Sequence, residues 1–113
     1  WIDDNYKEGL LHGNCKSFRD NGNLWIDDNY IEDRKQGNCK KWNTLGKLKS
    51  DYNFKEGRCH GICKEFYKNG NLWIVENYKE DRLHGNCKIW DILGNLESDC
   101  NYYGGNFLSD NII

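Results

Sequence analysis

The stretch Gly13-Asn14-Cys15-Lys16 decides the fold, because it recurs as GNCK at 37–40, GICK at 61–64 and GNCK at 85–88, always 24 residues on. Two positions after each lysine stands an aromatic residue, and four positions later a glycine. A fixed period of this length is typical of repeat arrays, in which each small unit stacks on its neighbours. Function must then come from the stacked surface, because no single unit holds a catalytic pocket.

The 113 residues divide into four full repeats and a partial one. We predict one array over 1–113, with repeats at 1–24, 25–48, 49–72 and 73–96 and a capping piece at 97–113. The sequence NGNLWI, at 21–26 and again at 69–74, adds a weaker 48-residue period. The capping piece lacks Gly-x-Cys-Lys, and its Phe107 and Leu108 are predicted to form an edge-capping strand.

Each repeat contains two short runs separated by turn residues. In the first repeat, 14–19 and 24–30 flank Asp20-Asn21-Gly22-Asn23, and Asn-Gly is a strong hairpin signal because both residues tolerate positive φ. A longer charged connection, such as 31–37, leads to the next unit, and recurrent glycine disfavours helix. We therefore predict an all-β fold, an elongated single-layer antiparallel meander of about five β-hairpin repeats of 24 residues.

A strand register follows from this hairpin. If 20–23 is the loop, Arg19 lies opposite Leu24, partner numbers add up to 43, and the sum rises by 24 at each later interface. Directly opposed side chains share a face, so one face carries a charge row, an asparagine row and an aromatic row. The charge row is Asp3, Lys16, Asp27, Lys40, Asp51, Lys64, Val75, Lys88 and Asp99. The asparagine row is Asn5, Asn14, Asn29, Asn38, Asn53, Ile62, Asn77, Asn86 and Asn101. The aromatic row is Trp1, Phe18, Trp25, Trp42, Lys49, Phe66, Trp73, Trp90 and Glu97.

The opposite face alternates rings with glycines, which lets each ring cover bare backbone. Its ring and glycine positions are Tyr6, Gly13, Tyr30, Gly37, Phe54, Gly61, Tyr78, Gly85 and Tyr102. Beside them we place the leucines Leu24, Leu48, Leu72 and Leu96. Under the rings we place Cys15, Cys39, Cys63 and Cys87 as small apolar residues, and we predict this face to be the better buried one.

The aromatic row is the main candidate for partner binding, because exposed aromatic stripes usually mark a contact surface. The alternative is that these cross-strand pairs only hold a thin sheet together, and both roles can coexist. The candidate residues are Trp1, Phe18, Trp25, Trp42, Phe66, Trp73 and Trp90.

The cysteines do not predict a metal site. Equivalent cysteines lie two strands, about 10 Å, apart, and Zn–S bonds of about 2.3 Å exclude a shared ion. Cys59, His60 and Cys63 lack a fourth ligand nearby in the sequence. Cys87 and Cys100 are direct partners in the register, which is compatible with a cross-strand disulfide or with two stacked free thiols. We expect no metal and no cofactor.

His12, His60 and His84 share their phase with Gln36. Because glutamine replaces histidine there, the position predicts a turn hydrogen bond, and no nucleophile converges on it. We therefore do not expect an enzyme.

Charge limits the class of partner. The net charge of −2 opposes a nucleic-acid surface, which needs unopposed Lys and Arg. A membrane surface would need a basic face, and the alternating charge row does not offer one. We expect protein partners, self-association through sheet edges or the aromatic face, and an intracellular or virion location with reduced thiols.

Tyr6, Gly9, His12, Gly13, Lys16, Phe18, Asn21, Gly22 and Leu24 follow a recognisable pattern. It resembles the MORN repeat, and in particular the variant of bacterial YwqK-like antitoxins and giant-virus proteins. The chain departs from the pattern at the cysteines, which replace an aromatic residue, and at Asp33 and Asp81, which replace a turn glycine. The resemblance implies elongated single-layer sheets that serve as scaffolds, lipid binding in some members, and no intrinsic catalysis.

Together these observations predict a non-catalytic scaffold for protein–protein interaction, for example a structural component of a viral particle. The alternative is an antitoxin-like protein that binds and neutralises a cognate toxin through the same surface.

Overall fold

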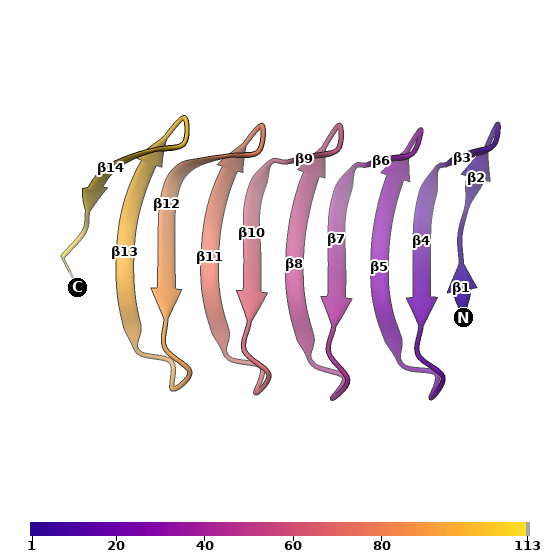
Figure 1. Cartoon of the computed structure of the whole chain (residues 1–113), viewed down its shortest axis with the longest axis horizontal. Coiled ribbons are helices and arrows are strands. Elements are labelled where there is room, and N and C mark those ends of the chain that lie inside the picture. The colour runs from indigo at the N-terminus through magenta and orange to yellow at the C-terminus, as the bar shows by residue number, and fades with distance from the viewer. Residues whose placement is uncertain (113) are drawn as a thin grey trace.

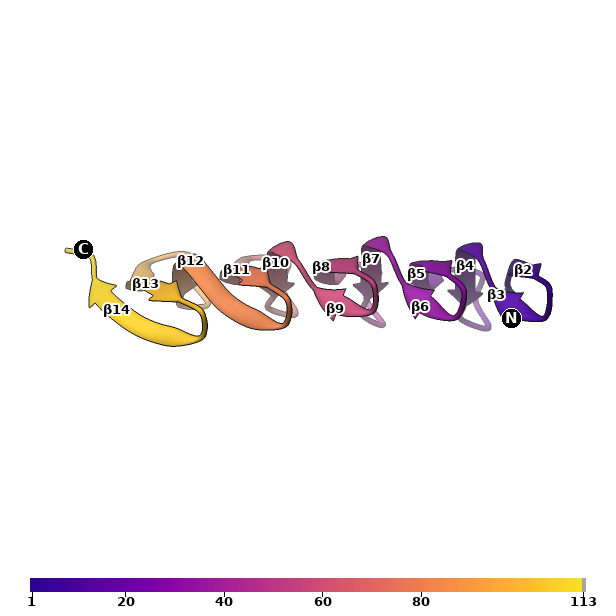
Figure 2. The same ribbon diagram turned by 90° about the horizontal axis from the view of Figure 1, so that it is seen from above.

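The protein is a single curved layer of strands. The computed structural model describes residues 1–112, so Ile113, the last residue of the predicted capping piece, lies outside the described residues. Figures 1 and 2 show neighbouring antiparallel strands following chain order. The molecule measures 49 × 32 × 11 Å, and Figure 2 shows that its strands lie in one layer. The predicted all-β antiparallel meander is confirmed.

The strands are of two lengths. The long strands are β4 (Gly13–Phe18), β5 (Leu24–Ile31), β7 (Gly37–Trp42), β8 (Leu48–Lys55), β10 (Gly61–Phe66), β11 (Leu72–Lys79), β12 (Arg82–Trp90), β13 (Leu96–Tyr103) and β14 (Asn106–Asp110). The short strands are β1 (Ile2–Asp3), β2 (Tyr6–Lys7), β3 (Leu10–Leu11), β6 (Arg34–Lys35) and β9 (Arg58–Cys59). All but β2 and β3 form one sheet, in which β14 lies at the edge beside β13, as predicted for Phe107 and Leu108. No helix among residues 1–112 is long and apolar enough to span a membrane.

The predicted register holds along the middle of the strands. Lys40 lies directly opposite Asp27 on one side and opposite Asp51 on the other, so these three side chains share a face. The partner sums of 43 and 91 hold for β4–β5 and β7–β8, from Gly13 opposite Tyr30 and Gly37 opposite Phe54 onward. The cross-strand pattern of lysine and aspartate therefore predicted the pairing correctly.

The register prediction is wrong at the hairpin loops, which we call the hairpin tips. The Arg19 N–H donates a hydrogen bond to the Asn23 carbonyl (N···O 2.8 Å) and not to that of Leu24, so the loop has three residues, Asp20–Gly22. Gly22 closes it with φ of +88°, a left-handed conformation that glycine adopts freely. A β-bulge between Ser17 and Phe18 then adds one residue to β5 and restores the sum of 43.

The bulge changes the aromatic row. Phe18 lies opposite Leu24, and Trp25 is the extra residue that the bulge leaves unpaired. The same shift recurs in each hairpin. The four extra residues are Trp25, Lys49, Trp73 and Glu97. The leucines paired with aromatic residues are Leu24, Leu48, Leu72 and Leu96. The predicted seven-ring row on one face is therefore corrected to a row in which aromatic residues alternate with leucines, and the leucines do not lie on the ring and glycine face.

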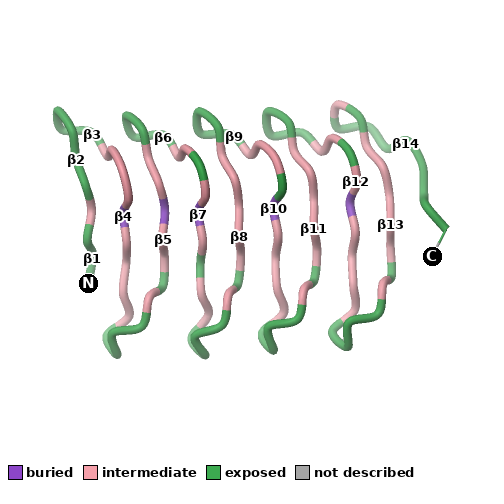
Figure 3. The backbone as a smooth tube through the Cα atoms, turned by 180° about the vertical axis from the view of Figure 1, so that it is seen from behind, coloured by how far each residue is buried: buried purple, intermediate pink, exposed green. Residues whose placement is uncertain are grey.

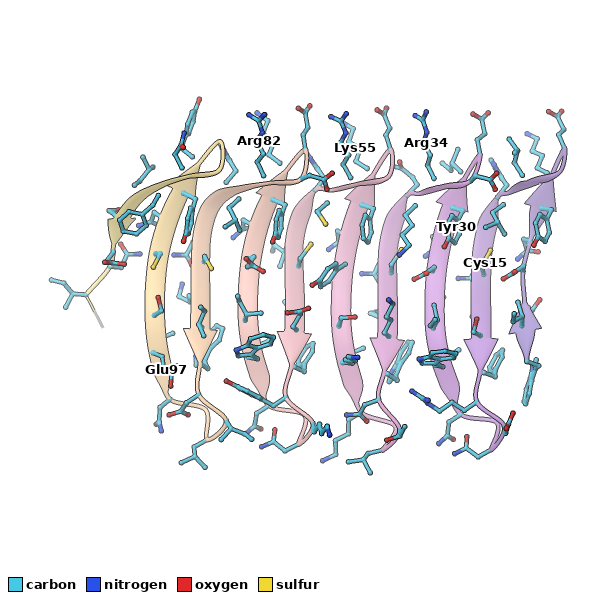
Figure 4. The ribbon with its side chains drawn as sticks, in the orientation of Figure 1. Cys15, Tyr30, Arg34, Lys55, Arg82 and Glu97 are labelled. Atoms are coloured by element: carbon cyan, nitrogen blue, oxygen red, sulfur yellow. The ribbon has the colours of Figure 1, made fainter. Side chains whose placement is uncertain are left out.

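The connection between repeats is also tighter than predicted. Tyr30 pairs with Lys35, not with Gly37, and Glu32 and Asp33 form a two-residue turn with φ of 49° and 65°. Two successive residues with positive φ are typical of a type I′ turn, whose twist matches that of the two flanking strands. Gly37, at φ +85°, lets the chain leave this turn and enter β7. These turns form the second long edge of the sheet, the turn edge, along which Arg34, Lys55 and Arg82 stand (Figure 4).

The turn aspartates explain one departure from the family pattern. The carboxylate Oδ1 of Asp33 accepts a hydrogen bond from the backbone N–H of Leu11 at 2.6 Å, and the Asp33 N–H donates to the Leu11 carbonyl at 2.9 Å. Asp81 repeats both bonds on Cys59. Each aspartate thus binds its turn to the preceding repeat.

Burial is confined to the middle of one face. Cys15, Cys39, Cys63 and Cys87 are 2–7% exposed, and Asp28 is 6% exposed. Figure 3 shows these short buried segments at mid-strand. We call the side that carries the four cysteines the cysteine face and the side that carries Asn14, Asn38 and Asn86 the asparagine face. The cysteines are buried small residues, and their face is the better buried one, as predicted.

Candidate protein-interaction surface

The asparagine face is a network of hydrogen bonds between strands. Each of its asparagines donates from Nδ2 to an aspartate on the neighbouring strand, Asn14 to Asp27 at 2.5 Å and Asn86 to Asp99 at 2.6 Å. Asn38 makes the same bond to Asp51. A charged acceptor strengthens such a bond, so these pairs tie together the two strands of the first, second and fourth hairpins.

The lysines and aspartates of the charge row form fewer ion pairs than the sequence suggests. Lys88 and Asp99, at 3.8 Å, are the one lysine–aspartate pair of that row within ion-pair distance among residues 1–112. The aspartates are held mainly by asparagine side chains. The lysines lie opposite them as predicted, but act as solvated neighbours, and exposed ion pairs contribute little to stability.

A second asparagine series joins one repeat to the next. The Asn29 carbonyl accepts from the N–H of Gln36 at 2.9 Å, where the chain turns out of the ladder. The Asn29 side chain then donates to the Asn38 carbonyl at 2.7 Å. In the same way, the side chain of Asn53 donates to the Ile62 carbonyl, and that of Asn77 donates to the Asn86 carbonyl. The recurrent asparagine therefore supplies the hydrogen bond that the departing strand no longer makes.

The third repeat replaces one polar pair by an apolar one. Ile62 stands at the position of Asn14 and Asn38, and Val75 stands at the position of Asp27 and Asp51. Both members of the asparagine–aspartate pair change together, which leaves neither a carboxylate without its donor nor an amide without its acceptor. This paired change supports the structural role of the network, because half of it alone would cost free energy.

The bulges direct two tryptophans to the cysteine face. The guanidinium of Arg19 lies 5.1 Å from the centroid of the Trp25 ring, and Tyr67 lies 5.9 Å from Trp73, centroid to centroid. Lys49, the equivalent bulge residue of the second repeat, borders the same groove as Ser50, Tyr52 and Phe54. Trp25 is 44% and Trp73 is 40% exposed. Both rings are therefore available to a partner.

The other predicted contact residues lie elsewhere. Trp1 and Phe18 stack with centroids 4.8 Å apart, and Trp1 is largely exposed. The rings of Phe18, Trp42, Phe66 and Trp90 are half-buried and lie opposite leucines. Trp42 and Phe66 also border the same hollow as Trp25 and Lys49. The structure thus brings Trp25 and Trp73 to one face and leaves the other aromatic candidates in the ring and leucine row.

A groove runs along β7 and β8 on the cysteine face. Its upper part, about 330 Å³, is bordered by Lys35, Cys39, Lys41, Ser50 and Tyr52, among others. Its lower part, about 350 Å³, shares Lys41 and Lys49 with the upper part. We call the two parts together the lysine groove. Sequence reasoning missed it, although lysine at 41 and 49 and serine at 50 depart from the residues of the first and third repeats.

The repeats differ most on this face. Positions 17, 41, 65 and 89 hold Ser, Lys, Glu and Ile, and positions 28, 52, 76 and 100 hold Asp, Tyr, Glu and Cys. The bulge positions 25, 49, 73 and 97 hold Trp, Lys, Trp and Glu, of which Glu97 lies near a hairpin tip (Figure 4). On the asparagine face the corresponding positions repeat with one paired exception. Variation is therefore concentrated where the fold does not require a particular side chain.

The thiols and phenols of the cysteine face are held in their neutral forms. Burial raises the pKa of the Cys39 thiol to about 11, and burial with the nearby Asp28 carboxylate raises the pKa of Tyr30 to about 12. Cys15 and Tyr30 lie on neighbouring strands in Figure 4. The Tyr52 hydroxyl donates to Glu65 at 2.6 Å, and burial together with this bond raises the Tyr52 pKa. Thiols that stay protonated at neutral pH are poor nucleophiles and poor metal ligands.

The histidine and glutamine positions predicted to bind the turns lie along the turn edge. The Gln36 side chain accepts from the Glu56 N–H at 2.8 Å, and Nδ1 of His84 accepts from the Gly104 N–H at 3.4 Å, so the predicted turn hydrogen bond is confirmed at these two positions. It is wrong at His12 and His60, whose buried Nδ1 atoms have no hydrogen-bond partner among residues 1–112. Cys87 and Cys100 lie directly opposite each other as free thiols, and Cys100 donates to Asp110 at 3.0 Å. A disulfide between them stays a prediction. Within the described part of the chain, no three His, Cys, Asp or Glu side chains gather as a metal site.

Comparison with known families agrees with this geometry. The family model of the MORN repeat variant matches residues 11–32 and 60–80. These two regions, the first and third hairpins, are similar to the MORN repeat variant, and repeats of this kind are in general non-catalytic interaction motifs for proteins and membranes. No curated protein matches the chain.

Proposed function

We propose that this chain of MORN-type repeats is a non-catalytic scaffold that binds a protein partner through its cysteine face. The observation that carries the proposal is the placement of Trp25 and Trp73, which the bulges direct to the variable face while leaving them 44% and 40% exposed. Tryptophan and arginine are enriched among the residues that dominate interface free energies, and Arg19 lies against Trp25.

The sheet supports this role because its stability does not depend on these rings. The asparagine–aspartate network and the ring and leucine row lie on the opposite face. A partner can thus be recognised by the cysteine face without disturbing the contacts that hold the strands together.

A structural part of a viral particle is the specific scaffold role that we propose, with an intracellular or virion location. The second candidate, neutralisation of a toxin, rests on the likeness to the antitoxin variant of the repeat and would use the same face. Gene neighbourhood separates the two, because an antitoxin gene should lie beside that of its toxic partner.

The test is partner capture from extracts of the native source by the double variant Trp25→Ala/Trp73→Ala. The matched control is Leu45→Ala/Leu93→Ala, which removes two exposed apolar side chains at the hairpin tips. We expect the tryptophan variant to lose the captured partner while its circular dichroism stays unchanged, and the leucine variant to keep it. Equal capture by wild type and the tryptophan variant would refute the proposal.

A further inference from the structure

The lysine groove is hollow because of a local change in the repeat. At the position next to each bulge residue the chain has Ile26, Ser50, Ile74 and Ser98. In the second hairpin, β7–β8, the small Ser50 lies between Lys41 and Glu65, its direct partners on the two neighbouring strands. In the first and third repeats isoleucine and tryptophan occupy the equivalent positions. Serine and a flexible lysine leave this space open.

The groove is basic in a chain of negative net charge. Five cationic side chains, Arg19, Lys35, Lys41, Lys49 and Lys68, border it, against the two carboxylates of Asp28 and Glu65. The chain as a whole carries −2. The five cations come from three neighbouring hairpins, so the excess of positive charge is local to the groove and is not shared by the whole surface.

Both carboxylates already have partners. Asp28, which is buried, lies 3.8 Å from the ammonium of Lys35, and Glu65 accepts the hydroxyl of Tyr52. The exposed lysines Lys41, Lys49 and Lys68 have no carboxylate within 4.0 Å among residues 1–112. Three cations thus point to solvent around a groove that also offers a hydroxyl at Ser50 and an aromatic wall at Trp25.

We infer that the lysine groove binds an acidic, extended segment of the partner protein. The inference rests on the proposed scaffold function and names the chemistry of the partner. A strand of six residues such as β7 has a length of about 20 Å at roughly 3.3 Å per residue, so a short extended segment fits along it. Carboxylates of that segment would pair with the free lysines, and charge complementarity gives specificity and speeds association.

A protein segment suits the groove better than a nucleic acid or a membrane. Nucleic acids are bound by continuous basic stripes that follow many phosphates. Here the positive charge is confined to the groove, and the two carboxylates at the groove oppose a chain of phosphates. An anionic membrane likewise attracts dense clusters of lysine and arginine, whereas here Asp28 and Glu65 lie among the cations.

The test uses a fluorescein-labelled dodecapeptide of alternating aspartate and serine and measures its binding by anisotropy. The key variant is K41I/K49E, which gives the second repeat the residues that the fourth repeat already has at 89 and 97, and which should therefore fold. The matched control is K7E/K79E, which changes two exposed lysines at the turn edge.

We expect the peptide to bind wild type and K7E/K79E alike, and to bind K41I/K49E at least about fivefold more weakly, as expected for two exposed charge contacts and added repulsion. Raising sodium chloride from about 50 to 500 mM should weaken wild-type binding, because salt screens exposed charges. A lysine–serine peptide of the same length should not bind.

Three results would overturn the inference. They are no binding of the acidic peptide to wild type, equal weakening in K7E/K79E, and equally strong, equally variant-sensitive binding of a twelve-residue oligothymidylate. Partner capture that depends on Trp25 and Trp73, combined with peptide binding that ignores Lys41 and Lys49, would leave the scaffold function standing and remove only the acidic segment. Capture that is unaffected in the tryptophan variant would instead remove the scaffold function itself.

Discussion

The two faces of the sheet are made from the same strands but follow different rules. On the asparagine face the second repeat looks like the first and the fourth, down to the bond from Asn14 to Asp27 and its counterparts. On the cysteine face only the buried cysteines and the ring and glycine positions repeat, while the bulge positions change from tryptophan to lysine to glutamate. The difference indicates that one face maintains the fold and the other is free to recognise a partner.

The largest expected effect is on the pH dependence of the unfolding free energy, to which the two faces contribute in different pH ranges. On the cysteine face, burial raises the pKa of Cys39 and Cys87 to about 11 and, with Asp28, that of Tyr30 to about 12. A raised acid pKa contributes stability that is complete below the unfolded value, near 9 for thiols and 10 for tyrosine, and is lost as pH rises through the folded value. Between pH 9 and 12 the free energy of unfolding should fall, on the order of several kcal/mol in total.

The contribution of the asparagine face to stability should instead be lost at acid pH. Hydrogen bonds from Asn86 and Asn111 lower the pKa of Asp99, so its contribution is present above the unfolded value near 4 and is lost as pH falls further. Urea unfolding from pH 2 to 12 measures both limits. Replacing Cys39 and Cys87 by alanine should flatten only the alkaline limb, and an unchanged alkaline limb in that variant and in Tyr30→Phe would contradict the assignment.

The next effect breaks the asparagine network in one repeat. Asn38→Ile leaves the Asp51 carboxylate without its donor and should cost about 2 kcal/mol of unfolding free energy. Adding Asp51→Val reproduces the Ile62 and Val75 pair of the third repeat and should recover about half of the loss or more. A double-mutant cycle by urea unfolding checks this, and simple additivity of the two changes would show that the pair is not coupled.

A smaller effect contrasts two neighbouring rings. Phe66 is half-buried opposite Leu72 on the asparagine face, whereas Trp73 is the exposed bulge residue beside it. Phe66→Ala should destabilise by about 2 kcal/mol, and Trp73→Ala by less than about 1 kcal/mol, although tryptophan is the larger side chain. Thermal unfolding of the two variants measures the order, and a reversed order would place Trp73 in the structural row.

The smallest effect concerns the turn edge, which joins the two faces. His84→Gln should leave the unfolding free energy nearly unchanged, because Gln36 already accepts the equivalent turn N–H at 2.8 Å. His84→Ala removes the acceptor of the Gly104 N–H and should cost about 1 kcal/mol. Equal stability of the alanine and glutamine variants would mean that this bond contributes nothing measurable.

The sequence predicted the middle of the strands because its chemistry there is paired. Lysine at 16 and 40 and aspartate at 27 and 51 agree in only one antiparallel register, which the structure confirms. At the hairpin tips the same reasoning failed for a geometric reason. A three-residue loop followed by a bulge uses the same number of residues as a four-residue loop, so the spacing cannot distinguish them, although they place Trp25 on opposite faces.

Only part of the candidate site could be predicted from the sequence. Trp25 and Trp73 were identified as contact residues from their aromatic character, but their face depends on the bulge. The lysine groove depends on which side chains fail to fill a space, and that requires the neighbours on both sides of Ser50. Comparison of the second repeat with the first and third would have drawn attention to Lys41, Lys49 and Ser50.

The central claim is that the repeated positions of the asparagine face stabilise the sheet, whereas the variable positions of the cysteine face, unlike its buried cysteines, serve recognition. An alanine scan by urea unfolding tests it directly, using six positions on each face. The asparagine-face set is Asn14, Asp27, Asn38, Asp51, Phe66 and Asn86, and the cysteine-face set is Trp25, Lys41, Lys49, Glu65, Trp73 and Glu97. We predict mean losses of about 1–2 kcal/mol for the first set and below about 0.5 kcal/mol for the second. Equal mean losses for the two sets would contradict the division of roles between the faces.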